Sequence, residues 1–140
     1  MARYNKHLVV LLGMLCTVSA QADIVVVVGT QAPVSSLSKE QIADIFLAKS
    51  ATFPGGGPAT PIEQTESAAP RQEFHSKVTG KSGAQLKAYW SKLVFTGKAT
   101  APQELADSAA VKQQVASNPA LIGYIDKSAV DGSVKVVFTP

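Results

Sequence analysis

Apolar positions along this chain alternate between short β-branched runs and helical stripes. Residues 24–28 read Ile-Val-Val-Val-Val and are followed by Gly29, a pattern typical of a strand covered on both faces. Beyond them, Ile42, Ile45 and Phe46 recur at helical spacing within residues 39–49, and Ser38 stands where an N-terminal cap is expected. The pattern therefore predicts a covered strand followed by an amphipathic helix.

The remaining pattern predicts further strands and helices in alternation. We expect strands at residues 60–64, 121–125 and 134–138, and helices at residues 69–79, 83–95 and from Asp107 to Asn118. Such an alternation predicts an α/β fold, with a mainly parallel sheet flanked by helices. No repeat or linker divides the sequence, so residues 23–140 are expected to form a single domain.

The helical pattern predicts whether three residues are buried or exposed. Phe74 lies on the buried face of its helix, and Trp90 shares an apolar stripe with the leucines of the next helix. Because aromatic side chains at helical spacing usually pack inward, we expect Trp90 in the core. His75, one residue after Phe74, is expected to be exposed or partly exposed.

The first 22 residues have the pattern of a secretory signal peptide. Arg3 and Lys6 form a positive start, residues 8–16 are apolar, and Ala20 and Ala22 are small residues at a cleavage site. The apolar run is far shorter than the roughly 20 residues that span a bilayer. We expect cleavage after Ala22 and a periplasmic or secreted protein whose mature part has no membrane span.

Charge and cysteine content narrow the functional classes. Removing Arg3 and Lys6 from the 13 basic residues leaves 11 basic residues against 10 acidic ones, with the signs interspersed. A nearly neutral chain gives no electrostatic reason to expect binding to nucleic acid or to an anionic membrane. The single cysteine, Cys16, lies in the leader, so no disulfide or thiol nucleophile is expected in the mature protein.

The sequence contains no evident catalytic constellation. His75 is the only histidine after the leader, no Gly-x-Ser-x-Gly motif is present, and no pair of carboxylates stands out. A zinc site would need carboxylates for nearly all of its ligands. We therefore expect a protein that is not an enzyme and that has no cofactor and no metal.

One segment, between the strand at 60–64 and the helix at 69–79, suggests ligand binding. Free N–H groups at such a junction favour a small anion, and Arg71 adds a forked cationic partner. The alternative is that Ser67 or Glu66 merely caps the helix. The candidate ligand-binding residues are Gln64, Thr65, Glu66, Ser67, Ala68, Ala69 and Arg71.

Three segments resemble the phosphate-binding periplasmic proteins of ABC importers. They are residues 37–47 (LSKEQIADIFL), residues 87–97 (KAYWSKLVFTG) and the Ile-Gly-Tyr-Ile sequence at 122–125. The segment at 87–97 is similar to the small single-domain members of that superfamily. The resemblance extends over nearly the whole mature chain, and it implies one lobe of the periplasmic-binding-protein type.

This chain differs from the family pattern in two respects. Transport proteins of the family close two lobes on their ligand, whereas this chain resembles only the second lobe. The family's phosphate loop reads Arg-Ser-x-Gly-Ser-Gly-Thr, and here Gln64, Ala68 and Pro70 stand in place of its arginine, a serine and its threonine. Glu66 and Arg71 still match the pattern.

Two hypotheses follow for the function. The first is an exported, non-enzymatic domain like the phosphate-binding proteins, with weak binding of phosphate or another small oxyanion at the loop that ends at Arg71. The alternative is a periplasmic or secreted accessory module that has lost anion binding and contacts a protein partner. Nucleic acid is expected as a partner in neither case.

Overall fold

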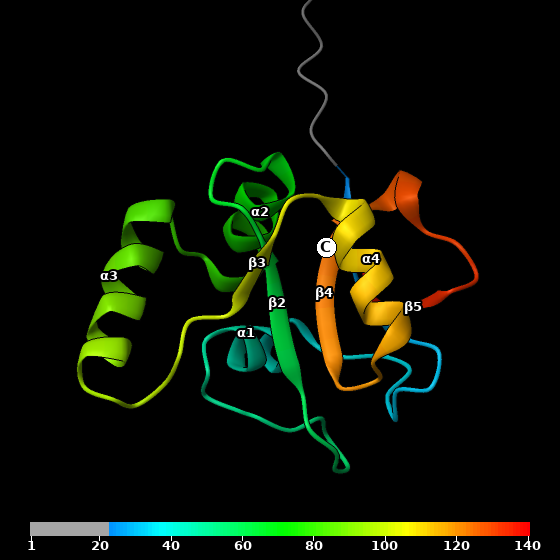
Figure 1. The fold of residues 1–140 in the computed structure, drawn as a ribbon, viewed down its shortest axis with the longest axis horizontal. Coiled ribbons are helices and arrows are strands. Elements are labelled where there is room, and N and C mark those ends of the chain that lie inside the picture. The colour runs from blue at the N-terminus through cyan, green and yellow to red at the C-terminus, as the bar shows by residue number, and fades with distance from the viewer. Residues whose placement is uncertain (1–22) are drawn as a thin grey trace, which may run out of the picture.

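The structure is a computed structural model that describes residues 23–140. The predicted leader, residues 1–22, lies outside the described residues. Within the described part, helices surround one five-stranded sheet (Figure 1). None of the helices in this part of the chain has the length and apolar character that crossing a bilayer requires.

The sheet has the strand order β3-β2-β4-β1-β5. β2 runs parallel to β3 and β4, since helices carry the chain back between these strands, whereas β1 runs antiparallel to β4 and β5. The predicted α/β class is confirmed, and the parallel pairing lies in the β3-β2-β4 part of a mixed sheet. The strands are β1 (Ile24–Gly29), β2 (Thr60–Gln64), β3 (Gln103–Leu105), β4 (Leu121–Asp126) and β5 (Val134–Phe138).

Helices cover both faces of β1, as the apolar run predicts. Val26 and Val28 pack in a core with α1 and α2, whereas Val25 and Val27 pack on the other face with α4. Residues 24–28 are at most 3% exposed. The three covering helices are α1 (Lys39–Phe46), which begins with the predicted Ser38 cap, α2 (Ala69–Phe74) and α4 (Ser108–Ser117).

Gly123 in β4 allows α4 to lie close to the sheet. A Cβ atom at this position would lie 2.5 Å from Cγ1 of Val111, which is much closer than carbon atoms approach. Val111 in α4 is fully buried and occupies the space that a side chain on β4 would need. The glycine of the Ile-Gly-Tyr segment is therefore a packing requirement of this domain.

The helix predicted at 69–79 continues from α2 into a π-helical turn, η1 (His75–Thr79), which ends at Gly80. Phe74 is buried, as predicted, and so is Val78. His75 is also buried, at 2% exposure, so the expectation that it is exposed or partly exposed was wrong. The cause is local: the wider turn, closed by an N–H of Gly80 donating to the His75 carbonyl over 2.7 Å, lets both Phe74 and His75 face inward.

The helix α3 (Gly83–Phe95) stands to the side of the sheet and covers neither face (Figure 1). Leu86 is its one buried residue. Trp90 is partly exposed and belongs to neither core, so its predicted core position was wrong. Its ring lies edge-on to Tyr89, whose hydroxyl donates to the carbonyl of Leu47 over 2.6 Å. Helical spacing thus identified the inward face of α3, but that face borders cavities instead of packed side chains.

Candidate functional site

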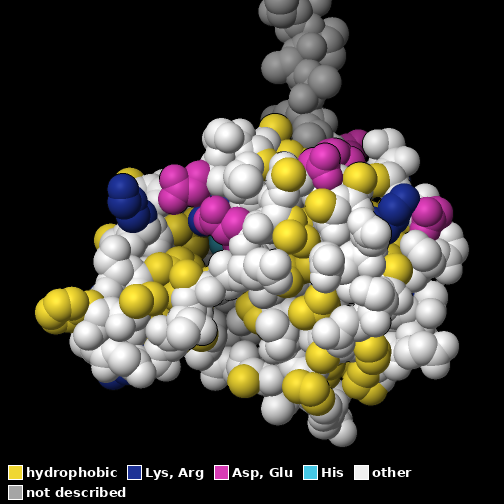
Figure 2. Space-filling model, viewed as in Figure 1, with side chains coloured by type: hydrophobic (Ala, Val, Ile, Leu, Met, Phe, Trp, Pro, Cys, Tyr) yellow, Lys and Arg dark blue, Asp and Glu magenta, His cyan; other side chains and the backbone are white. Residues whose placement is uncertain are grey.

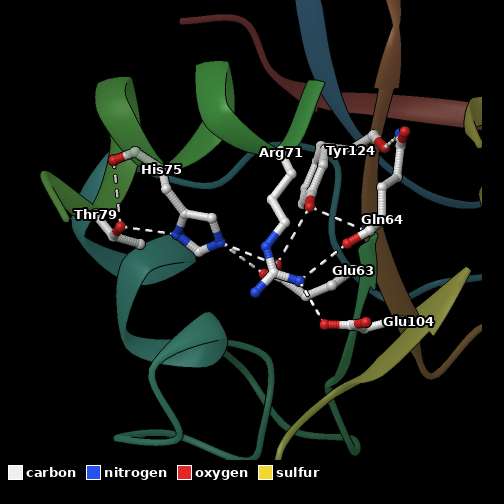
Figure 3. A network of polar contacts seen from close by, with 7 residues as sticks. All are labelled: Glu63, Gln64, Arg71, His75, Thr79, Glu104 and Tyr124. Atoms are coloured by element: carbon white, nitrogen blue, oxygen red, sulfur yellow. Dashed lines mark hydrogen bonds and ion pairs between the residues drawn. The ribbon is translucent and has the colours of Figure 1, made fainter. Parts of the chain in front are cut away.

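A buried carboxylate, that of Glu63 in β2, organises a polar network beside the start of α2 (Figure 3). Its Oε2 lies 3.3 Å from Nε of Arg71, and its Oε1 lies 2.8 Å from Nε2 of His75. The hydroxyl of Tyr124 in β4 donates to Oε2 over 3.2 Å. Partners from α2, η1 and β4 therefore compensate the cost of withdrawing this carboxylate from water.

Tyr124 connects the network to the apolar core. Its ring stacks on Phe74 with 4.4 Å between the centroids, and its oxygen accepts from the backbone N–H of Gln64 over 3.0 Å. Burial and, next, the Glu63 carboxylate hold the pKa of Tyr124 well above the usual value of about 10. The phenol therefore stays protonated and remains a donor to Glu63.

His75 is held at both ring nitrogens. Nε2 faces Glu63, and Nδ1 lies 2.9 Å from Oγ1 of Thr79, which itself lies 3.2 Å from the His75 carbonyl. In the neutral ring with the proton on Nε2, Nδ1 accepts from the Thr79 hydroxyl. In the charged ring both nitrogens donate, and the hydroxyl turns to the carbonyl. The same arrangement of side chains provides hydrogen bonds to both ring nitrogens in either form of the ring, so the ring of His75 is held against Glu63.

Arg71 is the residue through which the network reaches the surface. Its Nη1 donates to the carbonyl of Gln64 over 2.9 Å and to Oε1 of Glu104 over 2.8 Å, while its Nε faces Glu63. The Arg71 side chain is 13% exposed and that of Glu104 is 46% exposed. Two carboxylates thus share one guanidinium, and the outer one is accessible to solvent.

A cavity of about 280 Å³ lies between this network and α3. Figure 2 shows the hollow beside α3, with acidic side chains at its edge. Three carboxylates face two cations here, so the lining does not favour an anion by its net charge. The charged lining residues are Glu63, Glu66, Arg71, Lys87 and Glu104, and the apolar ones are Leu86, Trp90, Val94, Ala101 and Pro102.

Of the seven predicted ligand-binding residues, the structure brings only Glu66 and Arg71 to this cavity. Gln64 points into the core, where its amide nitrogen donates to Oγ of Ser108 and to the carbonyl of Tyr124. The other four do not line the cavity: Thr65, Ser67 and Ala68 lie on the loop between β2 and α2, and Ala69 is the first residue of α2. Whether any of the seven binds a ligand stays a prediction.

The alternative prediction, that Ser67 or Glu66 caps the helix that follows, is wrong. Ala68 is the N-cap of α2, and no side chain accepts a hydrogen bond at this helix start. Neither Ser67 nor Glu66 has a capping role in the described chain. Pro70 in the first turn removes one N–H that would otherwise need a partner, which reduces the cost of the uncapped start.

Sequence reasoning missed Glu63, Tyr124 and Glu104 as parts of the site. A signal for Glu63 was present, since a carboxylate inside a short strand that precedes a buried glutamine needs a partner. Glu104 had none, because β3 is a three-residue edge strand without a strong apolar pattern. Within residues 23–140, no group of three His, Cys, Asp or Glu side chains is placed to hold a metal ion.

Comparisons with solved structures give the class of fold. The chain superposes with a TM-score of 0.67 and 26% identity on a phosphate ABC transporter substrate-binding protein from Clostridium perfringens, whose structure contains bound phosphate. It superposes on an ABC-type phosphate transport receptor from Vibrio cholerae with a TM-score of 0.65 and 19% identity. For PstS from Borrelia burgdorferi the TM-score is 0.62 and the identity is 12%.

These likenesses cover 82% of this chain but only 44%, 45% and 46% of the three solved proteins. The chain therefore has the fold of phosphate-type substrate-binding proteins and spans less than half of their length. No protein-family model matches the sequence, and a search of curated proteins finds no significant match.

Proposed function

We propose that this protein is an exported, non-enzymatic lobe of the substrate-binding type that binds a small oxyanion weakly at Arg71. The observation that carries the proposal is the position of Arg71 at the cavity wall, where its outer partner is the half-exposed carboxylate of Glu104. An oxyanion reaches the guanidinium by displacing Glu104, while Glu63 keeps Arg71 in place.

Weak binding follows from the same contacts. The guanidinium is already neutralised by two carboxylates, and Ala68, Ala69 and Pro70 offer no hydroxyl to a ligand. A charged hydrogen bond contributes about 1.5–3 kcal/mol. Since a dissociation constant of about 1 mM corresponds to about 4 kcal/mol, the affinity is expected to be millimolar or weaker.

The test is a titration of the purified protein with phosphate and with sulfate, followed by NMR shifts of the Arg71 side chain. We expect shifts of its Nε–H signal in the millimolar range. Glu104→Gln should strengthen binding several-fold, because the competing carboxylate is removed. Glu66→Gln is the matched control, since it changes the charge of the same cavity without touching Arg71.

Two results would contradict the proposal. Equal gains from Glu104→Gln and Glu66→Gln would show that only the general charge of the cavity matters. An absence of any shift in the wild type and in Glu104→Gln, up to about 50 mM anion, would remove the anion site. The accessory-module alternative would then be favoured.

One observation favours that alternative, a module that contacts another surface. Phe95 at the end of α3 is 92% exposed, and Val94 beside it is 49% exposed. Large apolar side chains that stand out from a domain in this way mark an interaction surface. Phe95 lies outside the cavity lining, whereas Val94 also lines the cavity, so the two surfaces adjoin at Val94.

A further inference from the structure

We infer that the α3 arm, residues 81–98, binds the surface of an anionic phospholipid bilayer. This inference goes beyond the proposed function and does not depend on it, because it rests on the charge and the outer side of the α3 arm; of the residues it uses, Lys87 also lines the cavity at Arg71. Three observations carry it: a segregation of charge, an exposed apolar row, and the use of lysine alone as the basic residue.

Charge is segregated between the α3 arm and the rest of the domain. No acidic residue occurs between Glu73 and Glu104. The arm carries +4, whereas the other residues of 23–140 hold seven basic and ten acidic side chains and carry −3. The expectation of interspersed signs was therefore wrong for this segment. The four lysines form no ion pair with any other residue of the described chain; they are Lys81, Lys87, Lys92 and Lys98.

The outward side of α3 is a row of small and apolar side chains that ends in the nearly fully exposed ring of Phe95. Figure 2 shows hydrophobic side chains over α3, and one group projects from the edge of the molecule. At 100° per residue, Lys87 and Lys92 fall on opposite flanks of this row. The row consists of Ala84, Ala88 and Phe95, all of them exposed, whereas Ser91 lines the cavity.

The basic residues of the arm suit a lipid surface, and lysine is the main basic residue of the whole described chain, in which Arg71 is the one arginine. The arm contains four lysines and no arginine. Protein interfaces are enriched in arginine and depleted of lysine, because the guanidinium makes directed, paired contacts. Attraction to a layer of lipid phosphates needs only charge close to the surface, and each lysine there contributes to it.

The geometry also suits a helix that lies flat on a bilayer. An apolar row between two lysines places the ring of Phe95 among the acyl chains, while Lys87 and Lys92 extend their ammonium groups to the phosphates. α3 has this freedom because Leu86 is its one buried residue. A helix packed on the sheet, such as α4, has no apolar side left to offer.

The test is co-sedimentation of the purified protein with vesicles. We expect about tenfold more protein bound to phosphatidylglycerol/phosphatidylcholine vesicles than to phosphatidylcholine alone, and loss of that excess at about 0.5 M salt. Phe95→Ser should weaken binding about fivefold. Val136→Ser is its control, since Val136 lies on β5 and is 39% exposed.

A second pair of variants separates the arm from the overall charge. Lys92→Gln with Lys98→Gln should weaken binding about tenfold or more, because about two lysines' worth of attraction is lost. Lys39→Gln with Lys127→Gln changes the net charge equally, at exposed positions outside the arm, and should have little effect. All four variants are at the surface, so loss of folding does not confuse the result.

Three outcomes would overturn the inference. The first is equal binding to both kinds of vesicle, or no binding. The second is equal weakening by the two lysine pairs. The third is a concentration-dependent dimer that Phe95→Ser abolishes, without vesicle binding, which would assign this surface to a second copy of the chain. None of them bears on oxyanion binding at Arg71, which is measured separately.

Discussion

Two helices of this domain, α4 and α3, show opposite relations between apolar content and burial. α4 has only two large apolar side chains, Val111 and Val115, and both are fully buried against the sheet. α3 is longer and is much richer in large apolar residues, yet only Leu86 is buried. The large apolar side chains of α3 are Leu86, Tyr89, Trp90, Leu93, Val94 and Phe95.

The comparison teaches that burial depends on what lies opposite a helix. Opposite Val111 there is Gly123, whose missing side chain leaves space for a close fit. Opposite Trp90 there are two cavities, lined in part by Ala101 and Pro102. A helix rich in apolar residues can therefore keep exposed apolar side chains that are available to another surface. A helix with few apolar residues can bury all of them against the sheet.

The largest expected effect on stability is at a side chain that packs against the sheet. Phe74→Ala removes a fully buried ring that stacks on Tyr124 and lies 4.5 Å from the ring of Phe46. Because a cavity is left in the core, we expect the free energy of unfolding to fall by about 3–5 kcal/mol. Urea denaturation measures it, and a loss below about 1 kcal/mol would mean that the helical layer is as loosely packed as α3.

A smaller effect is expected at Tyr124. Tyr124→Phe leaves the buried N–H of Gln64 without a partner and removes one of the hydrogen bonds to Glu63, which should cost about 1–3 kcal/mol. The control is Tyr89→Phe, which removes a hydroxyl bonded only to the Leu47 carbonyl beside α3. Equal losses in the two variants, measured by thermal unfolding, would contradict the distinction between the buried network and α3.

Alkaline pH offers an independent measurement of the same contact. The folded pKa of Tyr124 is raised, so the unfolded chain loses this proton first, from about pH 10 upward. The stability contributed by the protonated phenol is therefore complete below pH 10 and declines above it, by about 1.4 kcal/mol per pH unit. In Tyr124→Phe the decline should be shallower by that amount, and parallel pH profiles would exclude this linkage.

The next effect concerns the inner side of α3. Trp90 is partly exposed and borders both cavities, so Trp90→Ala should cost about 1–2 kcal/mol, less than the removal of a core ring. Its fluorescence should be quenched by acrylamide in the folded protein. A loss comparable to that of Phe74→Ala would restore the core position that the helical pattern predicted.

The smallest effect is expected at the outer side. Phe95→Ser should change the free energy of unfolding by no more than about 0.5 kcal/mol, because the ring is 92% exposed. Val136→Ser, at 39% exposure, should have a somewhat larger effect. A large loss at Phe95 would show that its ring packs on the domain in solution, and would break the contrast with α4.

Much of the fold could be predicted because local patterns matched tertiary packing. The β-branched run at 24–28, the Ser38 cap and the end of the helix predicted at 69–79 each agree with the structure. The pairing of β1 could not be predicted, since a fully apolar strand carries no information about the direction of its neighbours. β3 was missed because its three residues, Gln-Glu-Leu, lack a strand pattern.

The site was less predictable, because its contacts join distant parts of the chain. Arg71 and Glu66 were found from their position after a strand, and the structure places both at the cavity. The partners of Arg71 come from β2 and β3, which are brought together only by parallel pairing. The buried ring of His75 pairs with Glu63, and this pairing cannot be recognised from the local sequence around either residue.

The two ends of the α3 arm affect the resistance of the molecule to proteolysis. Gly80 and Gly97 both adopt left-handed backbone angles, with φ of 68° and 69°, so each end of the arm is a sharp turn and not an extension of the core. Trypsin cuts after lysine, and the arm has four of them: two lie on α3, which has a single buried side chain, and two lie in the segments beside it. Cleavage there should come first and leave the sheet intact, held by α1, α2 and α4. The same positions are where an enzymatic tag or a fluorophore could be inserted with little disturbance to the fold.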